Sequence, residues 1–244
     1  MSDPRGAVVA KRLAGIRRVI AFSSAKGGVG KTMCTVVSAL ALAGGGQRVG
    51  ILDLDMQGAS AHLFLGIRPR LPEEKEGILP LPVTDGVSLM SVAPFTGERG
   101  LPLRGAEISD AILELLAVTI WGPAGLLLID MPPGMGEEIL DLARLVPRLE
   151  TLVVSTPSAV SVSVVERLLS VLKELRVTVP AVIANMVQDN AGGVKDLARR
   201  AGVGRVFEVP QDPSIETALG NPGALVSSPA GKALREAMLS LGYF

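Results

Sequence analysis

Short apolar runs alternate along the chain with stretches whose hydrophobic positions follow helical spacing. Several of the apolar runs contain only apolar residues, as expected for strands that are buried on both faces of a sheet. The runs predict strands at 18–23, 49–53, 88–92, 126–130, 151–155, 181–185 and 205–209. The stretches between them predict helices at 32–43, 107–118, 137–146, 160–175, 194–201 and 229–241.

This alternation predicts an α/β fold, in which helices flank a mostly parallel β-sheet on both faces. Ligands of such folds bind where the carboxyl ends of the strands run into loops. Segment 67–85 departs from the pattern because it is rich in proline and charge. We interpret it as a surface excursion, either a variable loop or a partner-binding element, and expect residues 1–244 to form a single domain.

The composition narrows the function classes. The chain has 244 residues, 48% of them hydrophobic, and its 24 basic residues balance its 24 acidic ones. A net charge of zero argues against nucleic acid and anionic membranes as partners. One cysteine permits no internal disulfide, and the single histidine beside it argues against a structural zinc site. The first 18 residues lack a continuous apolar stretch, so we expect no signal peptide and a cytoplasmic location.

A glycine-rich segment, Ser-Ala-Lys-Gly-Gly-Val-Gly-Lys-Thr at 24–32, joins the first predicted strand to the first predicted helix. Backbone N–H groups of such a loop bind phosphate oxygens, Lys31 adds a positive charge at the β/γ-phosphates, and the Thr32 hydroxyl can ligate Mg²⁺. A second lysine, Lys26, lies inside the loop. The residues expected to bind the nucleotide here are Lys26, Gly27, Gly28, Val29, Gly30, Lys31, Thr32 and Met33.

Two other predicted strands end in carboxylates. The strand 49–53 leads into Asp53 and Asp55, which share a face because they are two residues apart. Four apolar residues at 126–129 place Asp130 at a strand end, the arrangement of a Walker B aspartate that binds a Mg²⁺ water. The Pro-Pro-Gly at 132–134 then suits a switch loop that responds to the γ-phosphate.

The loop departs from G-x-x-x-x-G-K-[ST] at Ala25 and fits K-G-G-x-G-K-[ST] instead. In this it resembles the deviant Walker A motif of the MinD/ParA/Mrp class of P-loop ATPases, which have a SIMIBI-type fold. The string Ile-Asp-Met-Pro-Pro-Gly at 129–134 resembles the Mrp-type Walker B version. The resemblance implies ATP and Mg²⁺ as cofactors, with Mg²⁺ near Thr32, Asp53 and Asp130.

The same resemblance implies a catalytic set of Lys26, Lys31 and Asp55. Asp55 would orient the attacking water and accept its proton, and Lys26 would reach the phosphates of a second chain in a homodimer. Asn185 falls where the class contacts the adenine edge, although a capping role remains open. Pro210 and Gln211 resemble the loop that covers the base, and the likeness runs from about 16 to 237.

One family feature is missing from these 244 residues. Mrp-type proteins that carry an iron–sulfur cluster generally have a Cys-x-x-Cys pair after the Asn-Met segment, whereas the thiol here is Cys34, next to the P-loop. A cluster shared across a dimer needs about four thiolates. We therefore expect no iron–sulfur cluster on this chain.

The sequence favours a Mg²⁺-dependent ATP-binding and ATP-hydrolysing switch of the Mrp type, with slow intrinsic turnover. A link to iron–sulfur cluster assembly or transfer would run through an unidentified protein partner or cargo. The alternative is a MinD/ParA-like positioning or partitioning ATPase. The last predicted helix argues against membrane targeting, since it carries only Lys232 and Arg235 against Glu236. A nucleotide-gated scaffold without turnover also remains open.

Overall fold

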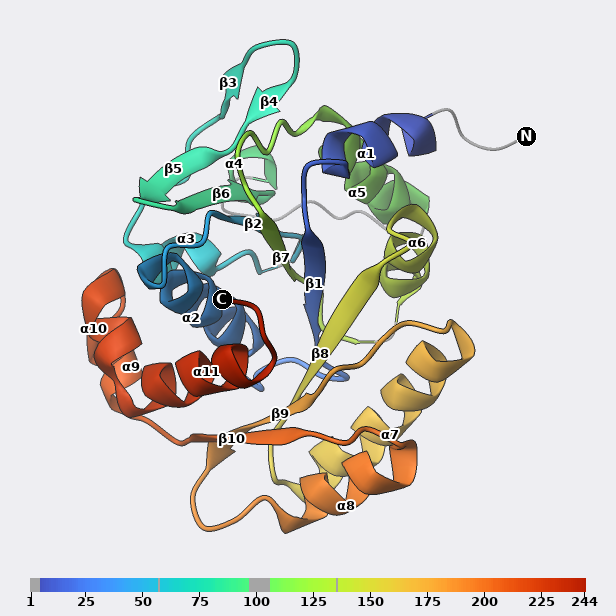
Figure 1. Ribbon diagram of the computed structural model, residues 1–244, viewed down its shortest axis with the longest axis vertical. Coiled ribbons are helices and arrows are strands. Elements are labelled where there is room, and N and C mark those ends of the chain that lie inside the picture. Colours follow the sequence, from blue (N-terminus) through green and yellow to red (C-terminus); the bar gives the residue numbers. More distant parts are fainter. Residues whose placement is uncertain (1–4, 57, 97–105, 135) are drawn as a thin grey trace.

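The computed structural model describes residues 5–56, 58–96, 106–134 and 136–244 (Figure 1). Its central feature is an eight-stranded sheet with the strand order β10-β9-β8-β1-β7-β2-β6-β5. The strands of this sheet are β1 (Arg18–Ser23), β2 (Val49–Asp53), β5 (Leu81–Thr84), β6 (Val87–Ser91), β7 (Leu126–Asp130), β8 (Leu149–Ser155), β9 (Val182–Val187) and β10 (Val206–Pro210).

Every neighbouring pair in this sheet is parallel except the pair of β5 and β6 at one edge, which is antiparallel. Residues of β2 and β7 are buried along the whole length of both strands, because helices cover both faces of the sheet. The mostly parallel α/β sheet that the sequence predicted is therefore confirmed. The strands β1, β2 and β7 have the predicted bounds.

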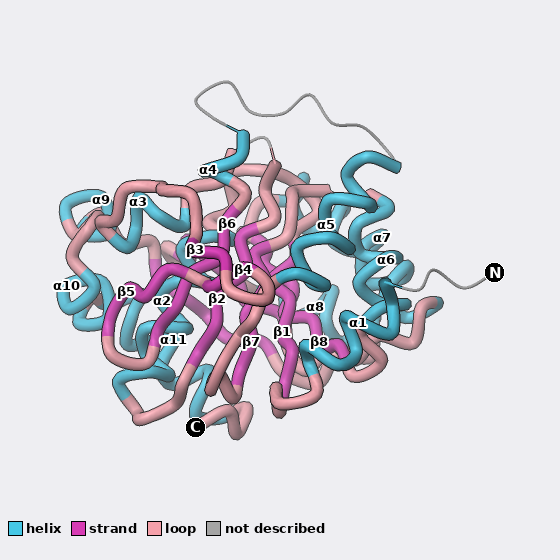
Figure 2. The backbone as a smooth tube through the Cα atoms, turned by 90° about the horizontal axis from the view of Figure 1, so that it is seen from above, coloured by secondary structure: helices cyan, strands magenta, loops and turns pink. Residues whose placement is uncertain are grey.

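The helices form two groups, one on each side of the strands (Figure 2). One group packs on the face that includes Ile20, Ile51 and Leu128 and consists of α2 (Lys31–Gly44), α3 (Ala61–Leu65), α9 (Ser214–Thr217), α10 (Pro222–Ser227) and α11 (Pro229–Ser240). The other packs on the opposite face and consists of α1 (Arg5–Leu13), α5 (Ala106–Val118), α6 (Glu137–Leu145), α7 (Ala159–Glu174) and α8 (Gly192–Ala201).

Segment 67–85 is more ordered than the surface excursion that its composition predicted. It contains β3 (Glu73–Glu74) and β4 (Ile78–Leu79), which pair with each other and project at the top of Figure 1, and then β5. The strand β5 extends the main sheet by pairing with β6. Pro82 is tolerated there because β5 is an edge strand, and the ladder is irregular between Pro82 and Thr84.

The sequence analysis also did not predict the helices α1, α3, α4, α9 and α10. Helix α1 packs against α5, where Arg12 Nε donates to the carbonyl of Ala117 at 3.0 Å. Helix α4 (Ala93–Thr96) is a single short turn after β6. Within the described ranges, no helix has the length and apolar character needed to span a bilayer.

Candidate functional site

The glycine-rich loop lies between the end of β1 and the start of α2, at the carboxyl edge of the sheet. Gly28 and Gly30 have φ values of 77° and 80°, which residues with a side chain rarely adopt. A Cβ on Gly30 would lie 2.2 Å from Nδ2 of Asn185. The loop therefore needs glycine at position 30 for its backbone conformation and also for space.

Asp130, at the end of β7, is the centre of a buried polar network. Its Oδ1 accepts a hydrogen bond from Lys31 Nζ at 2.6 Å, and its Oδ2 accepts one from the Thr32 hydroxyl at 2.6 Å. The side chains of Lys31 and Asp130 are 6% and 0% exposed, so this ion pair is shielded from water. The predicted Walker A and Walker B residues thus lie in direct contact.

Asp53 occupies the neighbouring position, since the register of β2 and β7 pairs it with Asp130. It accepts hydrogen bonds from the backbone N–H groups of Asp55 and Ala61, both at 3.2 Å, and from the Ser91 hydroxyl at 3.4 Å. Burial, and next the charge of Asp130, raise the pKa of Asp53 to about 7, while the two amides oppose the rise.

Burial also raises the pKa of Asp130, although the charge and hydrogen bond of Lys31 oppose the rise. When both carboxylates are ionised, the buried ammonium of Lys31, which pairs with Asp130, balances the charge of only one of them. Carboxylate and hydroxyl oxygens are the ligands that Mg²⁺ prefers. Within the described ranges, no three His, Cys, Asp or Glu side chains form a group that could hold a metal ion.

Asp55 lies past the end of β2 and is half-buried. Its Oδ1 accepts a hydrogen bond from the backbone N–H of Gly58 at 3.0 Å, so the turn that follows the strand orients its carboxylate. This position at the rim leaves Asp55 closer to solvent than Asp53 or Asp130, both of which are fully buried.

The loop after Asp130 is tied to the P-loop by backbone hydrogen bonds. Met131 N–H donates to the carbonyl of Phe22 at 3.2 Å, and Gly134 N–H donates to that of Ser24 at 2.9 Å. The Ser24 hydroxyl in turn donates to the carbonyl of Lys26 at 3.0 Å. The side chain of Lys26 is half-buried and forms no ion pair with any residue that the structure describes.

The residues expected to touch the base lie beside the loop. Asn185 is 1% exposed and donates from Nδ2 to the carbonyl of Val29 at 2.8 Å. Its Oδ1 is buried and has no hydrogen-bond partner among the described residues, so one acceptor faces no protein donor. Pro210 ends β10, and Gln211 N–H donates to the carbonyl of Val187 at 2.9 Å.

Some residues of the predicted loop set have no side chain available to contact a ligand. The side chains of Val29 and Met33 are 2% and 7% exposed and pack in the core around α2. Gly27 and Gly28 are exposed at the tip of the loop. Any contact of Val29 or Met33 with a phosphate would therefore come from the N–H group.

Two site residues were missed by the sequence analysis. The Thr35 hydroxyl lies 3.2 Å from Asp130 Oδ1 and donates to the carbonyl of Lys31 at 3.0 Å. Its spacing of four residues after Lys31 was a signal that could have revealed it. Ser91 reaches Asp53 because β6 pairs with β2, and that pairing is not visible in the sequence.

Cys34 follows the same loop but points into the core. Its thiol is 0% exposed, and burial raises its pKa far above the usual range. A buried, protonated thiol is a packing group rather than a ligand.

Comparison with known proteins identifies the family to which this chain belongs. A family model described as "ParA: NUBPL iron-transfer P-loop NTPase" matches residues 15–241. The "Iron-sulfur cluster carrier protein" of Mycobacterium tuberculosis H37Rv is 35% identical over 234 residues, which cover 88% of this chain and 61% of that protein. The protein of the same description from Methanocaldococcus jannaschii is 33% identical over 222 residues, covering 84% and 77%.

A solved structure supports the same assignment. The nucleotide-binding protein of Archaeoglobus fulgidus, in complex with ADP, superposes with a TM-score of 0.77 at 27% identity and covers 93% of this chain and 95% of that one. This chain spans only 61% of the length of the mycobacterial relative. The family match nevertheless extends over nearly all of its residues, and the protein therefore belongs to the ParA-type NUBPL iron-transfer P-loop NTPase family.

Proposed function

We propose that this protein is a Mg²⁺-dependent ATP-binding and ATP-hydrolysing switch of the Mrp type that takes part in iron–sulfur cluster transfer. One observation carries the proposal. Lys31 and Thr32 of the P-loop both contact Asp130 at 2.6 Å, so the phosphate-binding and metal-binding groups meet at one point. The similarity to cluster carriers and to an ADP-bound protein supports this reading.

Each residue has a distinct part in this function. Lys31, now on Asp130, would pair with the β/γ-phosphates of a bound nucleotide, and the N–H groups of Gly27–Thr32 would bind phosphate oxygens. Asp130, Asp53 and the Thr32 hydroxyl would hold Mg²⁺, and the ion would supply positive charge against the phosphates. The raised pKa of Asp53 is consistent with a carboxylate that needs a cation to ionise fully.

Asp55 is the residue that we assign to the attacking water. Its carboxylate lies at the rim of the site, and a hydrogen bond from Gly58 orients it, which are the requirements for a group that positions water and accepts a proton. On the other side, Asn185 Oδ1 is a buried acceptor without a donor, and the exocyclic amine of adenine would supply one. Pro210 and Gln211 would cover the base.

We further propose that two chains meet face to face across their nucleotides, with Lys26 reaching the phosphates of the other chain. Lys26 has no ion-pair partner in the described part of its own chain. Three large apolar side chains are exposed near the carboxyl ends of strands, namely Phe95 at 42%, Val160 at 67% and Met186 at 40%. A second copy would remove them from water.

The iron–sulfur cluster enters this proposal as cargo. The chain offers one thiol, and Cys34 is buried and protonated, so these 244 residues do not supply the thiolates of a cluster. We assign them the nucleotide-driven part of transfer, in the cytoplasm, with cluster ligands contributed by a partner. A positioning role of the MinD/ParA type has less support, since the curated relatives above are cluster carriers.

Calorimetry with ATP and Mg²⁺, followed by a phosphate-release assay, tests the switch. We expect saturable binding by the wild type, phosphate release that stops without Mg²⁺, and loss of binding in Lys31→Ala. Binding of ATP without phosphate release would instead support the alternative of a nucleotide-gated scaffold that does not hydrolyse ATP. Anaerobic reconstitution with iron and sulfide tests the cargo assignment, because a cluster spectrum from the isolated chain would contradict it.

A further inference from the structure

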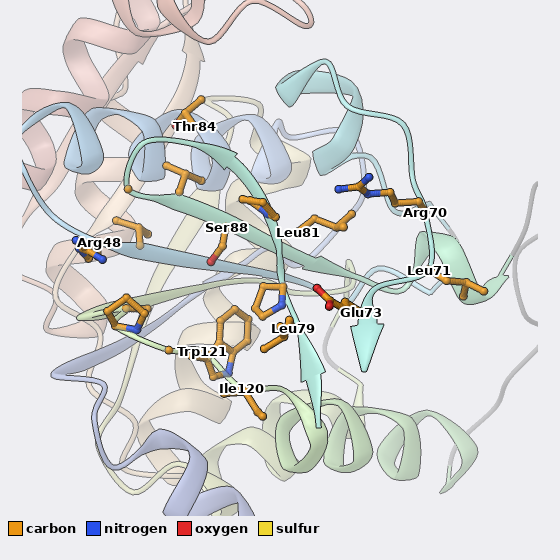
Figure 3. Close-up of a pocket in the computed structure, with 18 residues that line it drawn as sticks. Arg48, Arg70, Leu71, Glu73, Leu79, Leu81, Thr84, Ser88, Ile120 and Trp121 are labelled. Atoms are coloured by element: carbon orange, nitrogen blue, oxygen red, sulfur yellow. The ribbon is translucent and has the colours of Figure 1, made fainter. Parts of the chain in front are cut away.

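A cavity of about 700 Å³ opens at the edge of the sheet opposite the P-loop. Its wall includes Arg48 just before β2, Gly86 just before β6, and residues 121–124 just before β7. The strands β4 and β5 close the other side (Figure 3). Because β2, β6 and β7 begin here and run to the other edge, this cavity is separate from the candidate nucleotide site.

Apolar side chains form the body of the cavity. Leu79, Leu81 and Ile120 line it together with the indole of Trp121. Trp121 is 4% exposed and packs over Gly50, where a Cβ would lie 2.5 Å from the indole ring. The indole is therefore held by the sheet beneath it, so this wall of the cavity is already formed. A preformed apolar surface of this kind favours a ligand with an apolar body.

The charged groups at the rim are mostly arginines without partners. Figure 3 shows Arg48 on one side of the cavity and Arg70 on the other, and both are exposed. Neither guanidinium forms an ion pair or hydrogen bond with the described residues, in contrast to Arg18, which pairs with Glu150 at 2.9 Å. The acidic lining residue, Glu73, is paired with Lys75 at 2.9 Å. The rim therefore presents positive charge that nothing in the described chain neutralises.

We propose that this cavity binds a small amphipathic anion, with its apolar body against Trp121 and the leucines and its carboxylate or phosphate on Arg48 or Arg70. A volume of about 700 Å³ lies within the range of small-molecule sites, about 300–1,000 Å³. Guanidinium groups bind carboxylate and phosphate through paired N–H donors. This inference does not depend on the proposed ATPase function, since no residue of the P-loop or its carboxylates lines the cavity.

The fluorescence of a residue in the cavity wall can show whether a ligand is bound there. Trp121 is its single tryptophan, so tryptophan emission comes only from the cavity wall. The probe is sodium decanoate below its micelle concentration, and decanol is the neutral control of the same chain length. We expect a saturable change of emission with decanoate and an affinity for decanol that is lower by about tenfold, the effect of one charge-assisted hydrogen bond.

Variants of the two exposed arginines then identify which side chain contacts the anion. Arg48→Gln and Arg70→Gln should fold normally, and at least one should reduce decanoate affinity by about tenfold while leaving decanol binding unchanged. Arg148→Gln, on a different cavity near β8, is the matched control and should bind decanoate as the wild type does. ATP binding should be the same in all three variants.

Three outcomes would overturn the proposal. One is the absence of saturable decanoate binding by both emission and calorimetry. Another is equal affinity for decanoate and decanol, which would show an apolar groove without anion recognition. The third is dissociation of a dimer by decanoate in sedimentation, which would assign the surface to a second copy of the chain.

Discussion

Asp53 and Asp130 are register partners on the neighbouring strands β2 and β7, and neither side chain is exposed. Asp130 has the ammonium of Lys31 at 2.6 Å, whereas the hydrogen-bond donors around Asp53 are neutral. Like charges this close oppose each other's ionisation. The pair therefore sets the charge and the pH dependence of this part of the site.

The stability of the protein without Mg²⁺ should fall as pH rises through the weakly acidic range. Asp53 has an ordinary pKa of 3.8 and a folded-state pKa of about 7. Between these values the unfolded chain loses the proton while the folded chain keeps it, so the free energy of unfolding declines with pH. The full effect is roughly 4 kcal/mol.

Asp53→Asn isolates this effect in urea unfolding measured from pH 4 to pH 8. Asparagine loses one of the acceptor oxygens that serve Asp55, Ala61 and Ser91, which costs stability at every pH. The diagnostic result is the slope, because the wild type should lose stability relative to the variant as pH rises. Parallel pH curves would show that Asp53 does not retain its proton.

Lys31→Ala should abolish ATP binding and also destabilise the protein at pH 8. Removal of the ammonium leaves Asp130 buried without a counter-charge, for which about 3–5 kcal/mol is typical. The loss should shrink as pH falls, because burial raises the pKa of Asp130 and so favours its protonated, uncharged form. Lys75→Ala breaks an exposed pair with Glu73 and is the control, with an expected change below about 1 kcal/mol. An unchanged melting temperature for Lys31→Ala at pH 8 would contradict the buried pair.

Gly30→Ala should be far more damaging than Gly28→Ala. Both positions have positive φ, so each substitution incurs roughly 1–2 kcal/mol of backbone strain. Only the Cβ at position 30 meets another group, Asn185 Nδ2 at 2.2 Å, whereas the Cβ at position 28 meets nothing within 4 Å. Thermal melts compare the two, and Gly30→Ala/Asn185→Ala should recover part of the loss. Equal melting temperatures for the two single variants would argue against this contact.

Lys26→Ala should keep ATP binding but lose dimerisation and turnover. Lys26 lies within the loop yet has no ion-pair partner in the described part of its chain, as expected for a charge that acts on a second molecule. Sedimentation with ATP and Mg²⁺ and a phosphate-release assay measure the two effects. Lys232→Ala, which changes an exposed lysine of α11 outside the predicted site residues, is the control. A variant that sediments and turns over as the wild type does would remove Lys26 from the interface.

Asp55→Ala should bind ATP and fail to cleave it, which would leave a persistent dimer. The carboxylate lies at the rim, where it can reach water, so its loss should affect the chemical step rather than binding, by about 10²–10⁴-fold. Calorimetry measures ATP binding, and a phosphate-release assay measures the chemical step. Full turnover in this variant would assign water activation to another group.

The fold and the centre of the site follow largely from local pattern. Uninterrupted apolar residues mark β2 and β7 because both faces of these strands are covered, and each run ends at a carboxylate. The glycine spacing and two lysines at 26–32 mark the phosphate loop because backbone geometry and charge there are set by consecutive residues. These features depend on near neighbours in the chain, so the sequence alone determined them.

Other features depend on which strands lie side by side, and only the tertiary structure decided them. Register places Asp53 beside Asp130 and Ser91 beside Asp53. Burial by the packed sheet and helices, and next the charge of Asp130, raise the pKa of Asp53. The cavity at Trp121 needs β5 to add to β6 and β2 to lie between β6 and β7, so that 81–84 and 121–124, far apart in sequence, line one cavity. Long-range packing brings these groups together, and no local pattern of residues encodes that packing.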